Sequence, residues 1–302
     1  MEKISKAGVY DIPAEIYHGD CCISPSLSAS GAVEIIEECP RMFWHNSYLN
    51  PNREREEKDC FDIGTVAHMA MLEPHLLTEK VAVIEYSSYR TKDAQEMRDD
   101  ARACGKIPML EEQFKEIQAM RKELFSHPIA SKAFAKGNPE QSLIWKDEKS
   151  GVWCKSRPDW TPESGSYLID YKTSATANPE KFIKQSSSLG YHQKAAWQLE
   201  AAQIVTGKRP RSFYFVVQST KSPYLVSVFE LDATAILWGE IANAKAREIF
   251  SKCLKESYWP GYCPPGKDRE ASFELRLPAW AEKELEKRDE MGAFAIGAHV
   301  QS

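Results

Sequence analysis

Residues 151–173 constrain the fold more than any other stretch, because they hold two short alternating segments separated by a turn. Side chains alternate in character from 152 to 157 and again from 166 to 173, which is typical of β-strands. Pro158 ends the first segment, since proline cannot donate to a β-ladder. We therefore predict a hairpin that gathers Asp159, Asp170 and Lys172 at one end.

The charged residues of the second segment indicate a particular chemistry. Asp170 and Lys172 are two positions apart, so a pleated strand points both side chains to the same face. Two clustered carboxylates, those of Asp159 and Asp170, provide the hard oxygen ligands that Mg²⁺ prefers, and an adjacent lysine can hold or deprotonate a water molecule. This combination is typical of phosphodiester cleavage.

The same residues resemble a known signature. Pro158-Asp159 followed by Asp170-Tyr171-Lys172 is similar to the PD-(D/E)xK nuclease motif, with aspartate in the variable position. The resemblance implies an α/β fold with a restriction-endonuclease-like core, in which helices flank a central mixed β-sheet, with helical additions at the N-terminus and in mid-chain. We expect one nuclease domain over residues 1–265, with a catalytic core at about 61–230, and a C-terminal tail over 266–302 that contacts another subunit or a partner.

A second motif lies on a helix predicted for residues 61–73. A single histidine in an apolar helix, here His68, is more often a core residue than a ligand. The segment also resembles the Gly-x-x-x-His-x-x-Leu-Glu helix of RecB-like nucleases through Gly64, His68 and, one residue out of register, Leu72-Glu73. This resemblance implies that His68 binds a metal ion.

The family resemblance also implies which groups bind the cofactor and which act in catalysis. Mg²⁺ is the expected ion, with Mn²⁺ able to substitute. Glu140 begins a strand predicted for 140–146, and it is either a further ligand or a solvated strand-end residue. The expected metal ligands are His68, Asp159, Asp170, the backbone carbonyl of Tyr171 and, in the first alternative, Glu140; the expected catalytic residues are Asp159, Asp170 and Lys172.

A helix predicted from residue 191 to about 205 occupies the place of a Gln-x-x-x-Tyr motif in RecB-like nucleases. Two registers fit: one places the motif on Lys194 and Gln198, and the other on Gln193 and Trp197, with tryptophan replacing tyrosine. In either register, the motif residues would bind a DNA strand near the site. The expected DNA contacts are Arg157, Tyr191, Gln193, Lys194, Trp197 and Gln198, with Lys155, Lys181 and Lys184 as further candidates for the DNA backbone.

Finer details resemble the RecE-type exonucleases of phages and prophages. These are Cys154-Lys-x-Arg-Pro-Asp159, Asp170-x-Lys-Thr173 and the N-terminal Leu27-Ser-x-Ser30. The resemblance implies a Mg²⁺-dependent exodeoxyribonuclease that degrades linear double-stranded DNA from 5′ to 3′ and leaves 3′ single-stranded overhangs for recombination. It further implies double-stranded DNA ends as substrate, a single-strand annealing protein as partner, a ring-like homo-oligomer, and the cytoplasm of a bacterial host as location.

Composition limits the other function classes. The 42% apolar and 27% charged residues are ordinary for a soluble globular protein. No apolar run approaches the roughly 20 residues of a membrane span, and the first residues do not resemble a signal peptide. The formal net charge of −5 argues against a generally basic surface, although a local basic stripe can still hold DNA. The eight cysteines lack zinc-ribbon or iron–sulfur spacing, so we expect reduced thiols and no iron–sulfur cluster.

Three rival interpretations stay open at this point. The first is an endonuclease of the same fold, and the second is a non-catalytic subunit that binds DNA ends. The third is an unrelated α/β protein in which Asp170 and Lys172 form a surface salt bridge, worth at most about 1 kcal/mol.

Three further expectations concern the local structure. Residues 1–27 look loop-like, and residues 76–137 look mostly helical. A long helix from 233 to 253 is expected to bury one apolar face. That face would contain Ile236, Leu237, Ile241, Ala244, Ile249 and Phe250.

Overall fold

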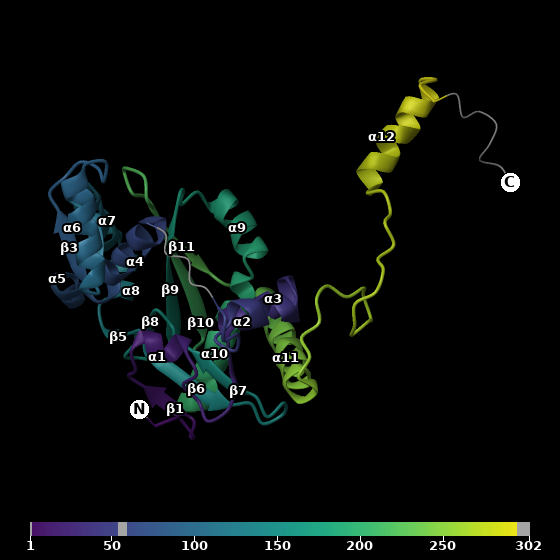
Figure 1. The fold of residues 1–302 in the computed structure, drawn as a ribbon, viewed down its shortest axis with the longest axis horizontal. Coiled ribbons are helices and arrows are strands. Elements are labelled where there is room, and N and C mark those ends of the chain that lie inside the picture. Colours follow the sequence, from purple (N-terminus) through teal and green to yellow (C-terminus); the bar gives the residue numbers. More distant parts are fainter. Residues whose placement is uncertain (1, 54–58, 295–302) are drawn as a thin grey trace. The chain divides into compact units, whose positions relative to one another are not determined.

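The computed structural model describes residues 2–53 and 59–294 of the chain (Figure 1). The contacts within it divide the chain into a body, Met1–Trp259, and a C-terminal segment, Pro260–Ser302. Among residues 2–53 and 59–294, no helix has both the length and the apolar character needed to span a bilayer.

A five-stranded mixed sheet lies at the centre of the body, with strand order β11-β10-β9-β8-β5. The two long central strands, β9 and β10, run parallel and pair along their full lengths. The shorter outer strands β11, β8 and β5 pair antiparallel to their neighbours. The strands are β5 (Gly137–Pro139), β8 (Trp160–Pro162), β9 (Tyr167–Ser174), β10 (Ser212–Ser219) and β11 (Val226–Glu230).

Apolar side chains cover both faces of this sheet, because successive residues of β9 and β10 point to opposite sides. Leu168 and Phe215 join the core beneath helix α10 (Tyr191–Thr206), while Ile169 and Val216 join the core beneath helices α4 (Asp59–Leu72) and α7 (Glu111–Ser126). Since neighbouring side chains in a strand point to opposite faces, one strand serves two cores. Helices therefore flank the central mixed sheet, as the sequence predicted.

A second sheet of four strands, in the order β1-β6-β7-β2, packs against the other side of α10. Its outer face is covered by the N-terminal residues, including Ile12 and Tyr17. Residues 1–27 therefore carry two strands and a short helix, and the prediction of a loop there was wrong. The elements are β1 (Gly8–Tyr10), α1 (Ala14–His18), β2 (Ser26–Ser28), β6 (Ser142–Lys146) and β7 (Trp153–Ser156).

The mid-chain addition lies beside α4 on the left of Figure 1. It is mostly helical, as predicted, but it also contains two parallel strands that the sequence reading missed. Its elements are a 3₁₀ turn (Pro74–Leu76), α5 (Leu77–Lys80), β3 (Val81–Ile84), α6 (Lys92–Ala103), β4 (Ile107–Leu110), α7 and α8 (Ala130–Ala133).

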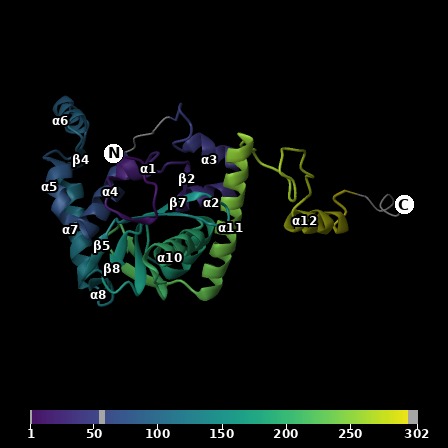
Figure 2. The same cartoon turned by 90° about the horizontal axis from the view of Figure 1, so that it is seen from below.

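Helices α2, α3, α9 and α11 lie on the other side of the body, where α11 follows its outer edge in Figure 2. Trp259 ends the body by packing its ring against Phe43 and Phe250. In the C-terminal segment, no residue between 260 and 294 is buried. The helices are α2 (Ala29–Glu37), α3 (Pro40–Asn46), α9 (Pro179–Ser188), α11 (Ala233–Glu256) and, in the C-terminal segment, α12 (Ala279–Glu290).

The predicted hairpin differs from the observed strands. β7 pairs with β6 and β2 in the four-stranded sheet, and only the short β8 pairs with β9. Pro158 lies at the point where the chain leaves one sheet for the other, because it cannot continue the ladder of β7. The three charged residues still lie together, but at the junction of two sheets.

Candidate active site

The junction between β8 and β9 exposes a backbone group that a longer ladder would cover. Trp160 pairs with Ile169, and no pair of these two strands lies beyond them on the Asp159 side among the described residues. The side chain of Asp159 takes the vacant position, since its Oδ2 accepts a hydrogen bond of 2.8 Å from the backbone N–H of Tyr171. The end of the short strand β8 therefore fixes this carboxylate against the middle of β9.

Asp170 and Lys172 lie on one face of β9, as their spacing predicts. The ammonium of Lys172 forms an ion pair with Asp170 Oδ1, and it lies 4.0 Å from Asp159 Oδ2. Asp170 is buried, so this pair is not the exposed salt bridge of the third rival interpretation. The three groups of the predicted motif meet around one ammonium group.

Helix α4 brings His68 to the same place. Its Nε2 lies 3.0 Å from Asp159 Oδ2, and its Nδ1 lies 3.5 Å from Glu140 Oε1. The helix approaches β9 closely at Gly64, where a Cβ atom would lie 3.9 Å from the hydroxyl of Thr173. The packing of α4 against β9 thus carries the histidine to the carboxylates.

Glu140 reaches the site through an unusual backbone conformation. Its φ angle is +51°, in the left-handed region that few residues other than glycine adopt. Its N–H donates to the carbonyl of Asp159 at 3.2 Å, which fixes the turn between β5 and β6 against the start of β8. The strained turn directs the carboxylate toward His68.

Burial and mutual repulsion separate the pKa values of the three carboxyl groups. Burial, assisted by the charge of Asp159, raises the pKa of Glu140 to about 7 and that of Asp170 to about 6. Burial also acts to raise the pKa of Asp159, but the charges of Lys172 and His68 outweigh it and lower that pKa to about 2. Asp159 is therefore ionised at neutral pH, while burial and the charge of Asp159 favour the protonated forms of Glu140 and Asp170.

This group of side chains fits a divalent metal ion. His68, Glu140 and Asp159 each offer a ligand atom, and these atoms lie within 4.8 Å of one another. Carboxylate oxygens with one imidazole nitrogen suit Mg²⁺ or Mn²⁺. A divalent cation bound here would lower the pKa values of Glu140 and Asp170, which burial and the charge of Asp159 raise. Asp170 lies beside this group, while a role for the carbonyl of Tyr171 stays a prediction.

Two of the predicted DNA contacts lie at the site, on α10. The ring of Tyr191 stacks on Phe215, with centroids 5.4 Å apart. The ammonium groups of Lys172 and Lys194 lie 5.7 Å and 5.4 Å from the centroid of the Tyr191 ring. Burial, together with the nearby charge of Lys172, lowers the pKa of Lys194. Of the two registers weighed for this helix, the one through Lys194 brings a cation to the site.

The other register points into the protein. Gln193 and Trp197 are fully buried, and Gln198, the second residue of the Lys194 register, is buried as well. The indole N–H of Trp197 donates to the carbonyl of Lys155 at 3.0 Å. Because a buried side chain cannot touch DNA on the surface, the predicted DNA contacts at Gln193, Trp197 and Gln198 need correction.

Lys155, in β7, and Arg157, just after it, both form hydrogen bonds with other parts of the protein. The guanidinium of Arg157 donates to Ser142 Oγ at 2.6 Å and to the carbonyl of Ile12 at 2.5 Å. The buried ammonium of Lys155 donates to the carbonyls of Tyr17 and Gly19, at 2.7 and 2.8 Å. These residues bind the N-terminal segment. The prediction that they contact DNA was therefore wrong.

Gln218, on β10, is a supporting residue that sequence reasoning missed. The hydroxyl of Tyr171 donates to its Oε1 at 2.7 Å, and its Nε2 donates to the carbonyl of Met120 at 2.8 Å. Gln218 thereby links the motif strand to α7. A glutamine among the apolar residues of β10 was the one signal available in the sequence.

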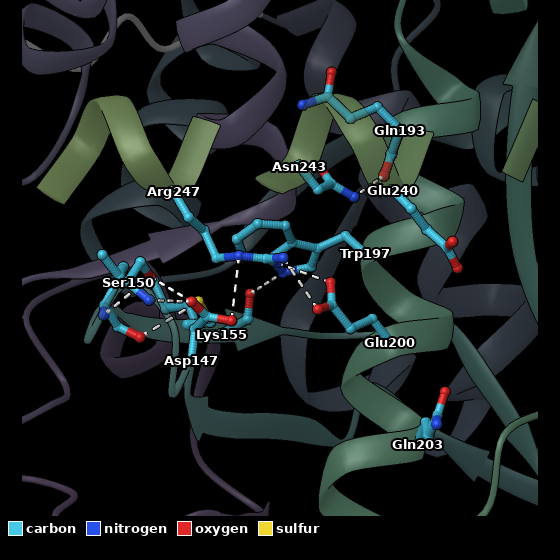
Figure 3. Close-up of polar contacts among 12 residues, drawn as sticks. Asp147, Ser150, Lys155, Gln193, Trp197, Glu200, Gln203, Glu240, Asn243 and Arg247 are labelled. Atoms are coloured by element: carbon cyan, nitrogen blue, oxygen red, sulfur yellow. Dashed lines mark hydrogen bonds and ion pairs between the residues drawn. The ribbon is translucent and has the colours of Figure 1, made fainter. Parts of the chain in front are cut away.

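A buried ion network fixes α10 from its other side (Figure 3). The guanidinium of Arg247, on α11, donates to both carboxylate oxygens of Glu200 at 2.8 and 3.1 Å. It also lies 3.5 Å from Asp147 and above the ring of Trp197. The network joins α11, α10 and the turn between β6 and β7, so it helps to hold α10 in place beside the site.

Comparison with known proteins agrees with this arrangement. A model of a family described as "PDDEXK-like domain of unknown function (DUF3799)" matches residues 28–266. No curated protein matches the chain. The family match confirms the predicted resemblance to PD-(D/E)xK proteins, while the narrower resemblance to RecE-type enzymes stays a prediction.

Among solved structures, a protein of Eubacterium rectale named as a candidate exonuclease aligns with a TM-score of 0.61 and 13% identity. The alignment covers 88% of this chain and 97% of that one, so the two share a fold. Rai1 of Scheffersomyces stipitis aligns with a TM-score of only 0.26 and 14% identity, over 64% of this chain and 60% of that one. A likeness of that size carries no structural argument.

Proposed function

The chain belongs to the PDDEXK-like family DUF3799, and from this premise we propose that it is a metal-dependent nuclease that hydrolyses phosphodiester bonds of DNA. One observation carries the proposal: His68, from a distant helix, meets Asp159, Asp170 and Lys172 at the junction of the two sheets. Family membership and the shared fold support a nuclease in general.

The metal would be held by His68, Asp159 and Asp170, with Glu140 as a further ligand. A bound Mg²⁺ would supply charge neutralisation at the scissile phosphate and would lower the pKa of the attacking water. Asp159 is prepared for this role, because the N–H of Tyr171 holds its carboxylate in place and its low pKa keeps it ionised. The turn at Glu140 places a further carboxylate oxygen near His68.

Lys172 would act on the reacting groups directly. The carboxylates of Asp170 and Asp159 outweigh burial and raise the pKa of its ammonium group, which therefore stays protonated. A protonated lysine in this position donates hydrogen bonds to the attacking water and to a phosphate oxygen, and offsets negative charge that builds in the transition state. It orients the water rather than removing its proton.

We propose further that the substrate is the end of linear double-stranded DNA, degraded from 5′ to 3′. The support is the resemblance of residues 154–159 and 170–173 to RecE-type exonucleases. Lys194 and Tyr191 would contact the DNA backbone beside the metal, since the Tyr191 ring lies beside both Lys172 and Lys194. Contacts of this kind position the strand without reading its sequence.

Digestion of end-labelled duplex DNA tests the proposal. We expect release of nucleotides from linear duplex with Mg²⁺, none with EDTA, and none from closed circular duplex. Cleavage of the closed circle would instead indicate an endonuclease, and inert protein with retained DNA binding would indicate an end-binding subunit.

Two variants test the residues assigned to the site. Lys172→Ala and Asp159→Ala should each abolish cleavage while circular dichroism shows a folded chain. Lys92→Ala is the matched control, because this lysine is exposed at the start of α6. Full activity of either site variant would refute the assignment.

A further inference from the structure

Helix α11 has two apolar faces, and only one of them is covered. Its buried face contains Gly239, Asn243, Ala246 and Phe250, and packs against α10 and α2. The sequence prediction assigned Leu237, Ile241 and Ala244 to this face, but the structure exposes all three. With 3.6 residues per turn, these three positions lie on the opposite side of the helix from Gly239 and Ala246.

The exposed residues form a stripe along the first half of α11. Leu237 is 53% exposed, Ile241 50% and the adjacent Trp238 61%. A helix on the surface of a globular protein normally presents polar side chains outward. The spacing of Leu237, Ile241 and Ala244, four and then three residues, is the one by which helices pack on one another.

The stripe continues into a groove beside it. Trp238 lines a hollow of about 560 Å³ together with Phe182, Phe229 and Leu231. Ile183, which also lines this groove, is 60% exposed. Contiguous apolar surface that spans two elements and a groove marks a site of protein association more often than a free surface.

Charges at the two ends of this surface have opposite signs. Glu230 and Asp232 line the groove at the start of α11. At the other end, a depression between α11 and the β6–β7 turn has a net positive lining, although Lys245 and Lys252 pair with Glu248 and Glu256. Its charged residues are Asp147, Lys149, Lys245, Arg247, Glu248, Lys252, Lys255 and Glu256. A copy turned end over end would therefore place its lysine-rich end over the acidic end of the first.

We propose that this face binds a second copy of the chain, with the two α11 helices packed antiparallel about a two-fold axis. The apolar stripe then meets itself and the charged ends pair across the axis. A helix of 24 residues is about 36 Å long, enough to carry the stripe and both charged ends. Such a contact uses the same surface on both copies and closes at two. It differs from the ring expected from the family resemblance, and it does not depend on the nuclease assignment.

The mass of the full-length protein in solution tests the association. Light scattering over a concentration series should give about 69 kDa, twice the 34.3 kDa of one chain. Leu237→Glu and Ile241→Glu should each weaken the dimer on the order of 100-fold, because each would bury a carboxylate. Leu225→Glu is the matched control, since this leucine is 58% exposed at the opposite end of β11 from α11, and it should leave the mass unchanged.

Single cysteines test the antiparallel arrangement. Thr234→Cys and Glu248→Cys lie near opposite ends of the stripe, so oxidation of a mixture of the two variants should give a cross-link that neither gives alone. The parent chain, with its own eight cysteines, sets the background. A monomeric wild type, a dimer unaffected by Leu237→Glu and Ile241→Glu, a closed assembly larger than two, or cross-linking within either single variant would each overturn the proposal.

Discussion

Replacing Glu140 with glutamine should stabilise the metal-free protein at neutral pH. The side chain keeps its size, so the turn at φ +51° is retained, but the charge is removed. Burial and the neighbouring Asp159 raise the pKa of Glu140 from its ordinary value of 4.5 to about 7. The folded state therefore binds more protons than the unfolded state between these two values, and the free energy of unfolding falls as the pH rises through that window.

The magnitude follows from the two pKa values. A change from 4.5 to about 7 corresponds to about 3 kcal/mol above pH 7 and to almost nothing below pH 4.5. This is an upper value, because the side chain is 25% exposed and solvent screens part of the repulsion. Glu140→Gln should thus gain up to about 3 kcal/mol over the wild type at pH 8, and little at pH 4.5.

Urea unfolding of both proteins in EDTA, at several pH values from 4.5 to 8, measures this difference. A difference that stays constant with pH would refute the electrostatic reasoning. Glu148→Gln, at an exposed position in the β6–β7 turn, controls for the change of residue type. Saturating Mg²⁺ should then stabilise the wild type more than Glu140→Gln, and an equal gain in both would show that Glu140 is not a ligand.

Three further predictions concern α10 and its surroundings. Arg247→Met leaves the carboxylate of Glu200 without its partner and should cost about 3 kcal/mol of stability in urea unfolding; a loss below about 1 kcal/mol would contradict a structural role for this ion pair. Lys194→Ala should lower kcat/KM about tenfold through loss of one phosphate contact, whereas the exposed Lys92→Ala should not. Trp197→Phe should cost about 1–2 kcal/mol by removing a buried hydrogen bond and some volume, with unchanged DNA affinity; weaker DNA binding by folded Trp197→Phe would restore this residue to the DNA surface.

Local spacing was sufficient to predict the central residues of the site. Asp170 and Lys172 share a face because a strand alternates, and the small residues of α4 admit a close neighbour whatever the rest of the fold. His68 and Asp159 lie 91 positions apart, and the sequence linked them only through the family resemblance. Their 3.0 Å contact depends on how α4 packs against the sheet.

Burial around the site was less predictable. Trp197 and Lys194 lie on the same helix, and the sequence motif fitted either of them. The choice depends on which side of α10 faces the four-stranded sheet and which faces β9, and that orientation comes from packing across elements distant in sequence. Arg157 and Lys155 looked like surface cations because nothing local shows that the N-terminal residues fold over them.

By itself, the sequence indicated a mixed sheet flanked by helices, a strand that carries Asp170 and Lys172 on one face, and a helix that carries His68. Periodicity and proline positions act over a few residues, so they can be read without the fold. Only the tertiary structure decided that β7 and β9 belong to different sheets, that Asp159 replaces a ladder partner beside Tyr171, and that α11 leaves Leu237 and Ile241 uncovered. These outcomes depend on contacts between distant parts of the chain, which compete for the same apolar surfaces and backbone groups.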